Sequence, residues 1–241
     1  MRTQRNCRGR HRAPRRTSGL LVSDHAAAWR SRLSDPPSSV QFVSPSSSAF
    51  PSVNVREWSA QPPSLPFAVL DVETTGLSPA RDRVIEIAVV RCAPDGSFID
   101  EWSTLVDPGR DPGPTHIHGI SAADLNGAPT FEDIAEELRE RLAGSMVAAH
   151  NLSFDAGFLA AEFQRAGSAT PDQPAVCTLQ LARYVLKDNE GYSLAACAAA
   201  LGIDHPNAHR ALPDTRVTAS VLAAMINILH PPSDQDALPF G

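Results

Sequence analysis

The sequence has no apolar run near the ~18 residues that a membrane-spanning helix requires, so we expect no membrane association. The short apolar stretch 19–22 is followed at once by polar residues and Asp24, which makes a poor secretory signal. Cysteine is scarce, with four positions: Cys7, Cys92, Cys177 and Cys197. Because no two of them show C-x-x-C spacing, they predict neither a zinc site nor a disulfide framework. A reducing, cytoplasmic setting fits this cysteine content best.

Acidic residues are scarce in the first 60 positions, which hold ten Arg against three acids, a net charge of +7. Residues 61–241 carry a net charge of −13. The first segment is rich in Ser, Arg and Pro, and it offers too little apolar surface to offset the entropy of ordering. We therefore expect a disordered basic arm over 1–62, a folded domain over 63–230 and a flexible tail over 231–241. An organellar transit peptide and an upstream start codon are other interpretations of the arm.

From about residue 66 onward, hydrophobic periodicity predicts alternating strands and helices, as in an α/β protein. Short buried or β-branched runs predict strands over 67–70, 84–92, 97–106 and 146–149. Amphipathic or Ala-rich runs predict helices over 130–142, 154–166, 176–186, 193–201 and 213–229. Ser153 is expected to cap the second of these helices. The hydrophobic content of 42% is enough for one well-packed core.

A pair of carboxylates ends the first predicted strand. Asp71 and Glu73 lie two positions apart, so both side chains point to the same face. Adjacent carboxylates repel each other unless a cation neutralises them, and their hard oxygens suit Mg²⁺ or Mn²⁺ rather than Zn²⁺. A D-x-E pair alone is common on surface strands. The full string Asp-Val-Glu-Thr-Thr-Gly over 71–76 is far rarer and predicts a ligand site, where Gly76 allows a tight turn.

Two further acids are found at the starts of predicted helices. Asp155 lies in the first turn of the helix after strand 146–149, and Asp214 follows Pro213 at the start of the last helix. An acid at either place also interacts favourably with the helix dipole, which is the purely structural interpretation. His209 lies five residues before Asp214, on the preceding loop. Each feature alone is more often structural than catalytic, so the inference depends on their occurring together.

Taken in order, the four acids and the histidine form three motifs that resemble those of the DEDDh family of 3′–5′ exonucleases. These motifs are Asp71-x-Glu73, Asp155 and His209-x₄-Asp214. The overall pattern is similar to that of the proofreading ε-type subunits of bacterial DNA polymerase III, over about residues 65–230. Segment 117–121, Ile-His-Gly-Ile-Ser, also resembles a segment of this family. The related DEDDy branch requires Tyr at the position of Arg210, so the chain resembles the DEDDh branch.

The resemblance implies an α/β, ribonuclease H-like fold, with a mixed five-stranded sheet and helices on both faces. It places the fifth strand at 175–178, in part of a segment that periodicity assigns to a helix. It also implies two Mg²⁺ (or Mn²⁺) ions bound by the carboxylates of Asp71, Glu73, Asp155 and Asp214. His209 is the implied general base, because an unperturbed imidazole pKa of about 6.5 allows proton transfer near neutral pH. The expected product is a nucleoside 5′-monophosphate released from a 3′ end.

Substrate contacts are implied by the same resemblance. The backbone around Thr74, Thr75 and Gly76 is expected to approach the terminal nucleotide and its 3′-hydroxyl. Leu77 and His118 are expected to flank its base or sugar, and an ordinary loop histidine is the alternative for His118. Because residues 61–241 are acidic overall, we expect no basic stripe along which a long nucleic acid could bind. We therefore expect contact with only a few nucleotides of a single-stranded or frayed DNA 3′ end.

The last residues of the chain form a separate motif. Gln235, Leu238 and Phe240 match the form Gln-x-x-Leu-x-Phe by which bacterial proteins bind the sliding clamp. A Pro-rich tail with two incidental apolar residues is the alternative. The sequence thus predicts a metal-dependent 3′–5′ exodeoxyribonuclease of DNA replication proofreading or repair, with the sliding clamp and a replicative DNA polymerase as partners. A DEDDh exoribonuclease of RNA processing and a noncatalytic clamp- or polymerase-binding module are the alternatives.

Overall fold

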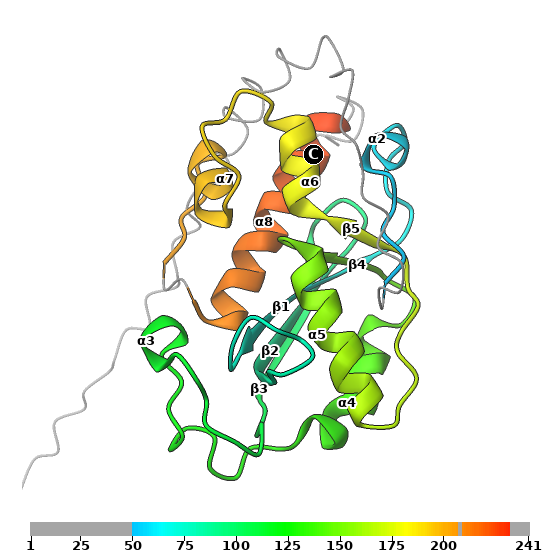
Figure 1. Ribbon diagram of the computed structural model, residues 1–241. Coiled ribbons are helices and arrows are strands. Elements are labelled where there is room, and N and C mark those ends of the chain that lie inside the picture. The colour runs from blue at the N-terminus through cyan, green and yellow to red at the C-terminus, as the bar shows by residue number, and fades with distance from the viewer. Residues whose placement is uncertain (1–49, 207–208, 232–241) are drawn as a thin grey trace, which may run out of the picture.

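The computed structural model describes residues 50–206 and 209–231, which form a mixed five-stranded sheet covered by helices (Figure 1). The strands are β1 (Phe67–Thr74), β2 (Val84–Cys92), β3 (Phe98–Leu105), β4 (Met146–Ala149) and β5 (Ala175–Cys177). Their order in the sheet is β3-β2-β1-β4-β5. β1 is antiparallel to β2 and parallel to β4, which makes the sheet mixed. The expected sheet is confirmed, including the fifth strand that the family resemblance implied.

Helices connect and cover these strands. They are α2 (Val55–Trp58), α3 (Thr115–His118), α4 (Phe131–Leu142), α5 (Leu152–Arg165), α6 (Thr178–Val185), α7 (Leu194–Ala200) and α8 (Ala211–Leu229). Because β5 leads directly into α6, the helix that periodicity predicts over 176–186 is wrong for its first two residues. Among the described residues, no helix combines the length and the apolar character needed to cross a membrane.

The sheet has a hydrophobic core on each face. Phe67 and Val69 pack into a core shared with α6, α7 and α8. Ala68 and Leu70 pack into the opposite core, shared with α4 and α5. This alternation follows from the two-residue repeat of a strand. Helices on both faces are therefore confirmed, and the same repeat directs Asp71 to the side that α8 covers.

Residues 50–59 belong to the folded domain, so the expectation of a disordered arm is wrong for them. Phe50 and Val55 are fully buried. Ser52 forms a parallel bridge with Ala175, which extends the outer edge of β5. Burial of the two apolar side chains offsets the entropy of ordering this Ser- and Pro-containing segment.

Two helices begin earlier than their sequence signals predict. α5 begins at Leu152, and Ser153 lies inside it instead of capping it. Asn151 precedes the helix with a φ of 76°, a left-handed conformation that Asn adopts more readily than most residues. α8 begins at Ala211, two residues before the predicted start.

Candidate active site

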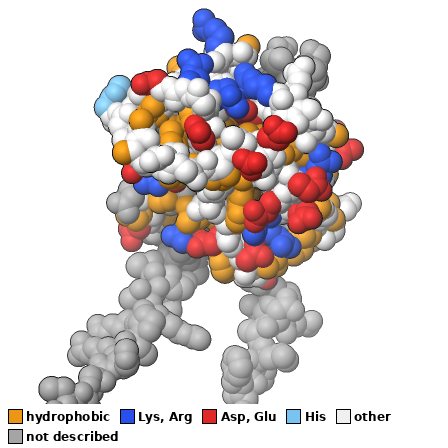
Figure 2. Space-filling view, turned by 90° about the horizontal axis from the view of Figure 1, so that it is seen from below, with side chains coloured by type: hydrophobic (Ala, Val, Ile, Leu, Met, Phe, Trp, Pro, Cys, Tyr) orange, Lys and Arg blue, Asp and Glu red, His pale blue; other side chains and the backbone are white. Residues whose placement is uncertain are grey.

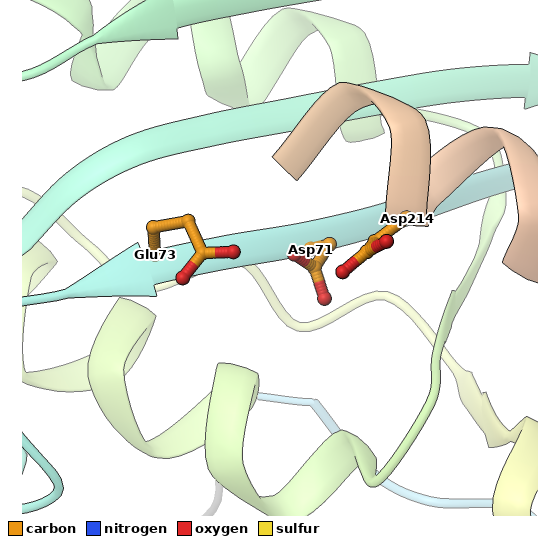
Figure 3. Close-up of side chains that lie close together, drawn as sticks. All are labelled: Asp71, Glu73 and Asp214. Carbon is orange, nitrogen blue, oxygen red and sulfur yellow. The ribbon is translucent and has the colours of Figure 1, made fainter. Parts of the chain in front are cut away.

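Three carboxylates meet where β1 lies beside the start of α8 (Figure 3). Asp71 and Glu73 project from one face of β1, and Asp214 lies in the first turn of α8. One carboxylate oxygen from each lies within 4.8 Å of the other two. The Asp214 carboxylate points toward Asp71, and Glu73 lies further along β1. The structure thus brings together three of the predicted metal ligands.

A fourth acid, Asp155, reaches the same place from α5. Its buried carboxylate accepts a hydrogen bond from the Val72 N–H, with a distance of 3.2 Å to Oδ1. β1 pairs with β4 only as far as Val69, so the Val72 N–H lies beyond the paired part of that edge. The charge of Asp155 raises the pKa of Asp71, so the two carboxyls interact electrostatically. All four predicted acids therefore lie in one cluster.

Burial and mutual repulsion raise the pKa values of Asp71, Glu73 and Asp155. Desolvation raises the pKa of Asp71 well above its usual range, and the charges of its acidic neighbours raise it further. Desolvation also raises the pKa of Asp155. The pKa of Glu73 rises to about 7 through desolvation and the charge of Asp214. Four carboxyls this close are not all ionised near neutral pH unless cations offset their charge. This oxygen donor set fits divalent metal ions of the Mg²⁺ or Mn²⁺ type.

Two histidines lie beside Asp214. The His209 N–H donates to Asp214 Oδ2 at 3.0 Å, while the residue itself is exposed and has a φ of 71°. The predicted base is therefore tied to the cluster through its backbone. His205 places its Nε2 2.7 Å from Asp214 Oδ1. No sequence pattern indicates His205, because it lies on a loop outside any helical or strand repeat.

An ion pair between a buried Glu and a half-exposed Arg lies at the start of α8. Glu86 is on β2, directly opposite Glu73 in the β1–β2 ladder, and its side chain is 7% exposed. The Arg210 guanidinium donates to both Glu86 oxygens, at 2.8 Å from Nη2 to Oε1 and 3.0 Å from Nε to Oε2. The Ala211 N–H donates to Oε2 at 2.9 Å. Sequence patterns do not indicate this pair, because its members are 124 residues apart.

The end of β1 and the loop after it hold four of the residues predicted to approach a nucleotide. Thr74 Oγ1 donates to the Gly76 carbonyl at 2.6 Å, and Thr75 Oγ1 accepts a backbone hydrogen bond at 3.0 Å. A Cβ at Gly76 would lie 2.5 Å from the Asp82 carboxylate, so a larger residue there would displace that side chain. Leu77, in this loop, is 86% exposed. The backbone is therefore well ordered by local hydrogen bonds, and an apolar side chain is presented to solvent.

His118 lies inside the protein rather than on an open loop. It is 2% exposed, and its Nδ1 accepts a hydrogen bond from the Ile120 N–H at 3.0 Å. Burial lowers the pKa of its imidazole, which favours the neutral form. Its contact with substrate stays a prediction. The predicted clamp-binding residues Gln235, Leu238 and Phe240 lie outside the described part of the chain.

The comparison with protein families identifies the chain by its central segment. The exonuclease family matches residues 68–222, so the chain belongs to this family. A PolC-type DNA polymerase III of Clostridium perfringens is 37% identical over 158 residues, which are 65% of this chain and 11% of that protein. The 3′–5′ exonuclease DinG of Bacillus subtilis is 35% identical over 168 residues, which are 68% of this chain and 18% of that protein. The chain thus spans less than a fifth of the length of these relatives.

Solved structures show the same fold. A structure of exonuclease I has a TM-score of 0.61 at 21% identity, covering 70% of this chain and 42% of that chain. Escherichia coli exonuclease I in complex with a dT13 oligonucleotide has a TM-score of 0.60 at 21% identity, covering 68% and 41%. At this level of identity the likeness concerns the fold alone. It confirms the expected α/β, ribonuclease H-like architecture.

Proposed function

We propose that this chain is a metal-dependent 3′–5′ exonuclease that removes nucleoside 5′-monophosphates from DNA 3′ ends, in replication proofreading or repair. The observation that carries the proposal is the carboxylate group of Asp71, Glu73 and Asp214, with oxygens within 4.8 Å of one another. Asp155 adds a fourth negative charge beside Asp71. Membership of the exonuclease family supplies the reaction class, and the carboxylates supply the means of binding metal.

The proposed reaction is hydrolysis of the terminal phosphodiester. Two divalent ions, when bound, supply positive charge that stabilises the attacking and leaving oxygens at phosphorus. Asp71, Glu73, Asp155 and Asp214 hold and orient these ions. His209 accepts the proton of the attacking water, because its side chain is exposed beside Asp214 and imidazole is the side chain that most often serves as a general base. The bond between phosphorus and the 3′-oxygen breaks, and that oxygen takes a proton from solvent.

DNA is the proposed substrate because of what the similar proteins are named for. They include a DNA polymerase, a 3′–5′ exonuclease and an exonuclease I that was solved with a dT13 oligonucleotide. We propose single-stranded or frayed 3′ ends as the form that is bound. The contacts to the terminal nucleotide are assigned to Thr74, Thr75, Gly76, Leu77 and His118. Exposed Leu77 offers an apolar surface on which a base can pack.

A replicative polymerase and the sliding clamp are the proposed partners. In the PolC-type relative, the matching region is a small part of a polymerase, which favours a role for this chain beside one. Leu238 and Phe240 would fill an apolar pocket of the clamp, and Gln235 would hydrogen-bond at its edge. In a pull-down, purified clamp should capture the wild-type chain but not the Leu238→Ala/Phe240→Ala double variant. Capture of that variant at the wild-type level would reject clamp binding through this tail.

The test of the activity uses 5′-labelled single-stranded DNA and RNA of one sequence, with Mg²⁺, Mn²⁺ or EDTA. The DNA should shorten from its 3′ end only when metal is present. Asp71→Ala should abolish this shortening, and His209→Ala should slow it by roughly 10²–10⁴-fold, as expected for loss of a general base. His230→Ala, at the far end of α8, is the matched histidine control and should cleave normally.

The outcomes separate the alternatives. Faster cleavage of RNA than of DNA would assign the chain to RNA processing. Absence of cleavage of either substrate, by folded protein that binds metal, would contradict the enzyme proposal and leave a noncatalytic module. Cleavage that persists in Asp71→Ala would show that a contaminating nuclease, or a different site, is responsible.

A further inference from the structure

The geometry points to Glu86 and Arg210 as positioning residues that set Asp214 against the carboxylates of β1 and so complete the metal site. This inference rests on the proposed function, since it concerns the same site. Neither residue is one of the four acids or the histidine of the motifs. Three structural observations support the assignment, and each concerns the first turn of α8.

The first observation is that α8 has no local cap. Arg210 occupies the N-cap position, and its side chain makes no capping hydrogen bond to the helix. The N–H groups in the first turn of a helix need partners from elsewhere. Glu86 supplies one from β2, because its Oε2 accepts the Ala211 N–H at 2.9 Å. The sheet therefore provides the cap that the local sequence lacks.

The second observation is the form of the ion pair. Arg210 meets Glu86 through two parallel hydrogen bonds of 2.8 and 3.0 Å, which fix orientation as well as distance. The Glu86 side chain is 7% exposed, so the buried end of the pair cannot move freely. One carboxylate thus holds both the N-cap side chain and the first helical N–H.

The third observation is the place of this anchor relative to the acids. Glu86 lies opposite Glu73 in the β1–β2 ladder, so the start of α8 is fixed over this part of the sheet. Asp214 follows Arg210 by four residues, about one helical turn, and its carboxylate faces Asp71. A shift or rotation of this turn would separate Asp214 from the two carboxylates of β1. The Glu86–Arg210 pair therefore influences metal binding through the position of Asp214.

A role of Arg210 in positioning Asp214 can be distinguished by experiment from a purely electrostatic role. Arg210 is a cation close to Glu73, so on charge alone its removal would strengthen the binding of another cation there. If Arg210 acts by holding α8, its removal weakens cation binding instead. Arg210→Lys separates the two further, because it keeps the charge and loses the two-pronged geometry.

α8 also carries a matched control. Arg216 donates through Nε and Nη2 to the two oxygens of Glu101 on β3, with 2.7 Å between Nε and Oε2. This is again an Arg of α8 paired with a Glu of the sheet, and the two Arg side chains are similarly exposed, at 54% for Arg216 and 48% for Arg210. The difference is that Arg216 lies beyond the first turn and that the Glu101 side chain is 30% exposed, against 7% for Glu86. Arg216→Met therefore removes the same type of contact from the same helix without releasing Asp214.

The experiment measures Mn²⁺ binding to the full chain by calorimetry and by electron paramagnetic resonance. It is done at one fixed pH of about 8 for the wild type and every variant. Glu86→Gln, Arg210→Met and Arg210→Lys should each weaken Mn²⁺ binding by about tenfold or more, as loss of a residue that orients a ligand does. The Glu86→Gln/Arg210→Met double variant should bind no more weakly than the weaker single, since the two act as one unit. Arg216→Met should bind as the wild type does.

The positioning role would be overturned if Arg210→Met bound Mn²⁺ as tightly as the wild type or more tightly. It would also be overturned if Arg210→Lys bound Mn²⁺ as tightly as the wild type. Circular dichroism and thermal unfolding establish that each variant is folded. If Arg210→Met does not fold, Arg210→Lys decides the question, because it alone keeps the charges of the pair unchanged. Wild-type chain that binds no Mn²⁺ would overturn the proposed function and this inference together. Wild-type binding that the variants leave unchanged would overturn this inference alone.

Discussion

At the scale of single residues, the Glu73 carboxyl links stability to pH and to metal. Burial raises its pKa from the ordinary 4.5 to about 7, with Asp214 and Glu86 adding to the rise and Arg210 opposing it. Between these two pH values the native chain holds more protons at this site than the unfolded chain does. The free energy of unfolding therefore decreases as pH rises through this window when no metal is bound.

We predict that the metal-free chain loses thermal stability as pH rises from about 5 to about 7.5, and that Mg²⁺ or Mn²⁺ offsets this loss. The stabilisation by metal should grow with pH, because metal binds the ionised carboxylates and competes with protons. Unfolding temperatures recorded in EDTA and in excess metal across this range provide the measurement. Glu73→Gln in EDTA is the control and should show a flatter pH dependence. Parallel curves with and without metal would contradict the prediction.

At the scale of elements, local rules predict a large part of the site. The two-residue repeat of β1 is enough to place Asp71 and Glu73 on one face. The order of strand and helix is enough to place Asp155 at the start of α5, close to the same end of the sheet. These predictions succeed because they depend only on residues that are neighbours in sequence.

Contacts between distant segments account for what the sequence does not predict. Pro213 indicates a helix start, but α8 begins at Ala211 because Glu86, 125 residues away, accepts its N–H. The Ser and Pro content around Phe50 predicts disorder, yet that ring is buried in the core beside β5. His205 meets Asp214 although nine residues separate the two in the chain. Neither local composition nor spacing carries a signal for these three contacts.

At the scale of the whole molecule, charge limits how nucleic acid can be bound. Residues 61–241 carry a net charge of −13, and the bound metal ions would offset only the part at the carboxylate cluster. On the face in Figure 2, acidic side chains spread over the middle, and several basic side chains gather at one edge. A long run of phosphates requires a basic stripe along its path. The charge distribution therefore favours contact with a few terminal phosphates.

We predict that log kcat/KM on single-stranded DNA falls with the logarithm of salt concentration with a slope of about −1.4 to −2.1, the value for two or three phosphate contacts. Above about six nucleotides, kcat/KM should not depend on the length of the oligonucleotide, because the additional phosphates make no contact with the protein. Steady-state rates at fixed Mg²⁺ over a series of KCl concentrations and lengths test both statements. A slope steeper than about −4 would show an extended binding surface. Replacement of the Arg residues in 1–16 by Ser would then locate this extended surface. A shallower slope in the variant would assign the extra phosphate contacts to the basic segment. An unchanged slope would assign them to the folded domain.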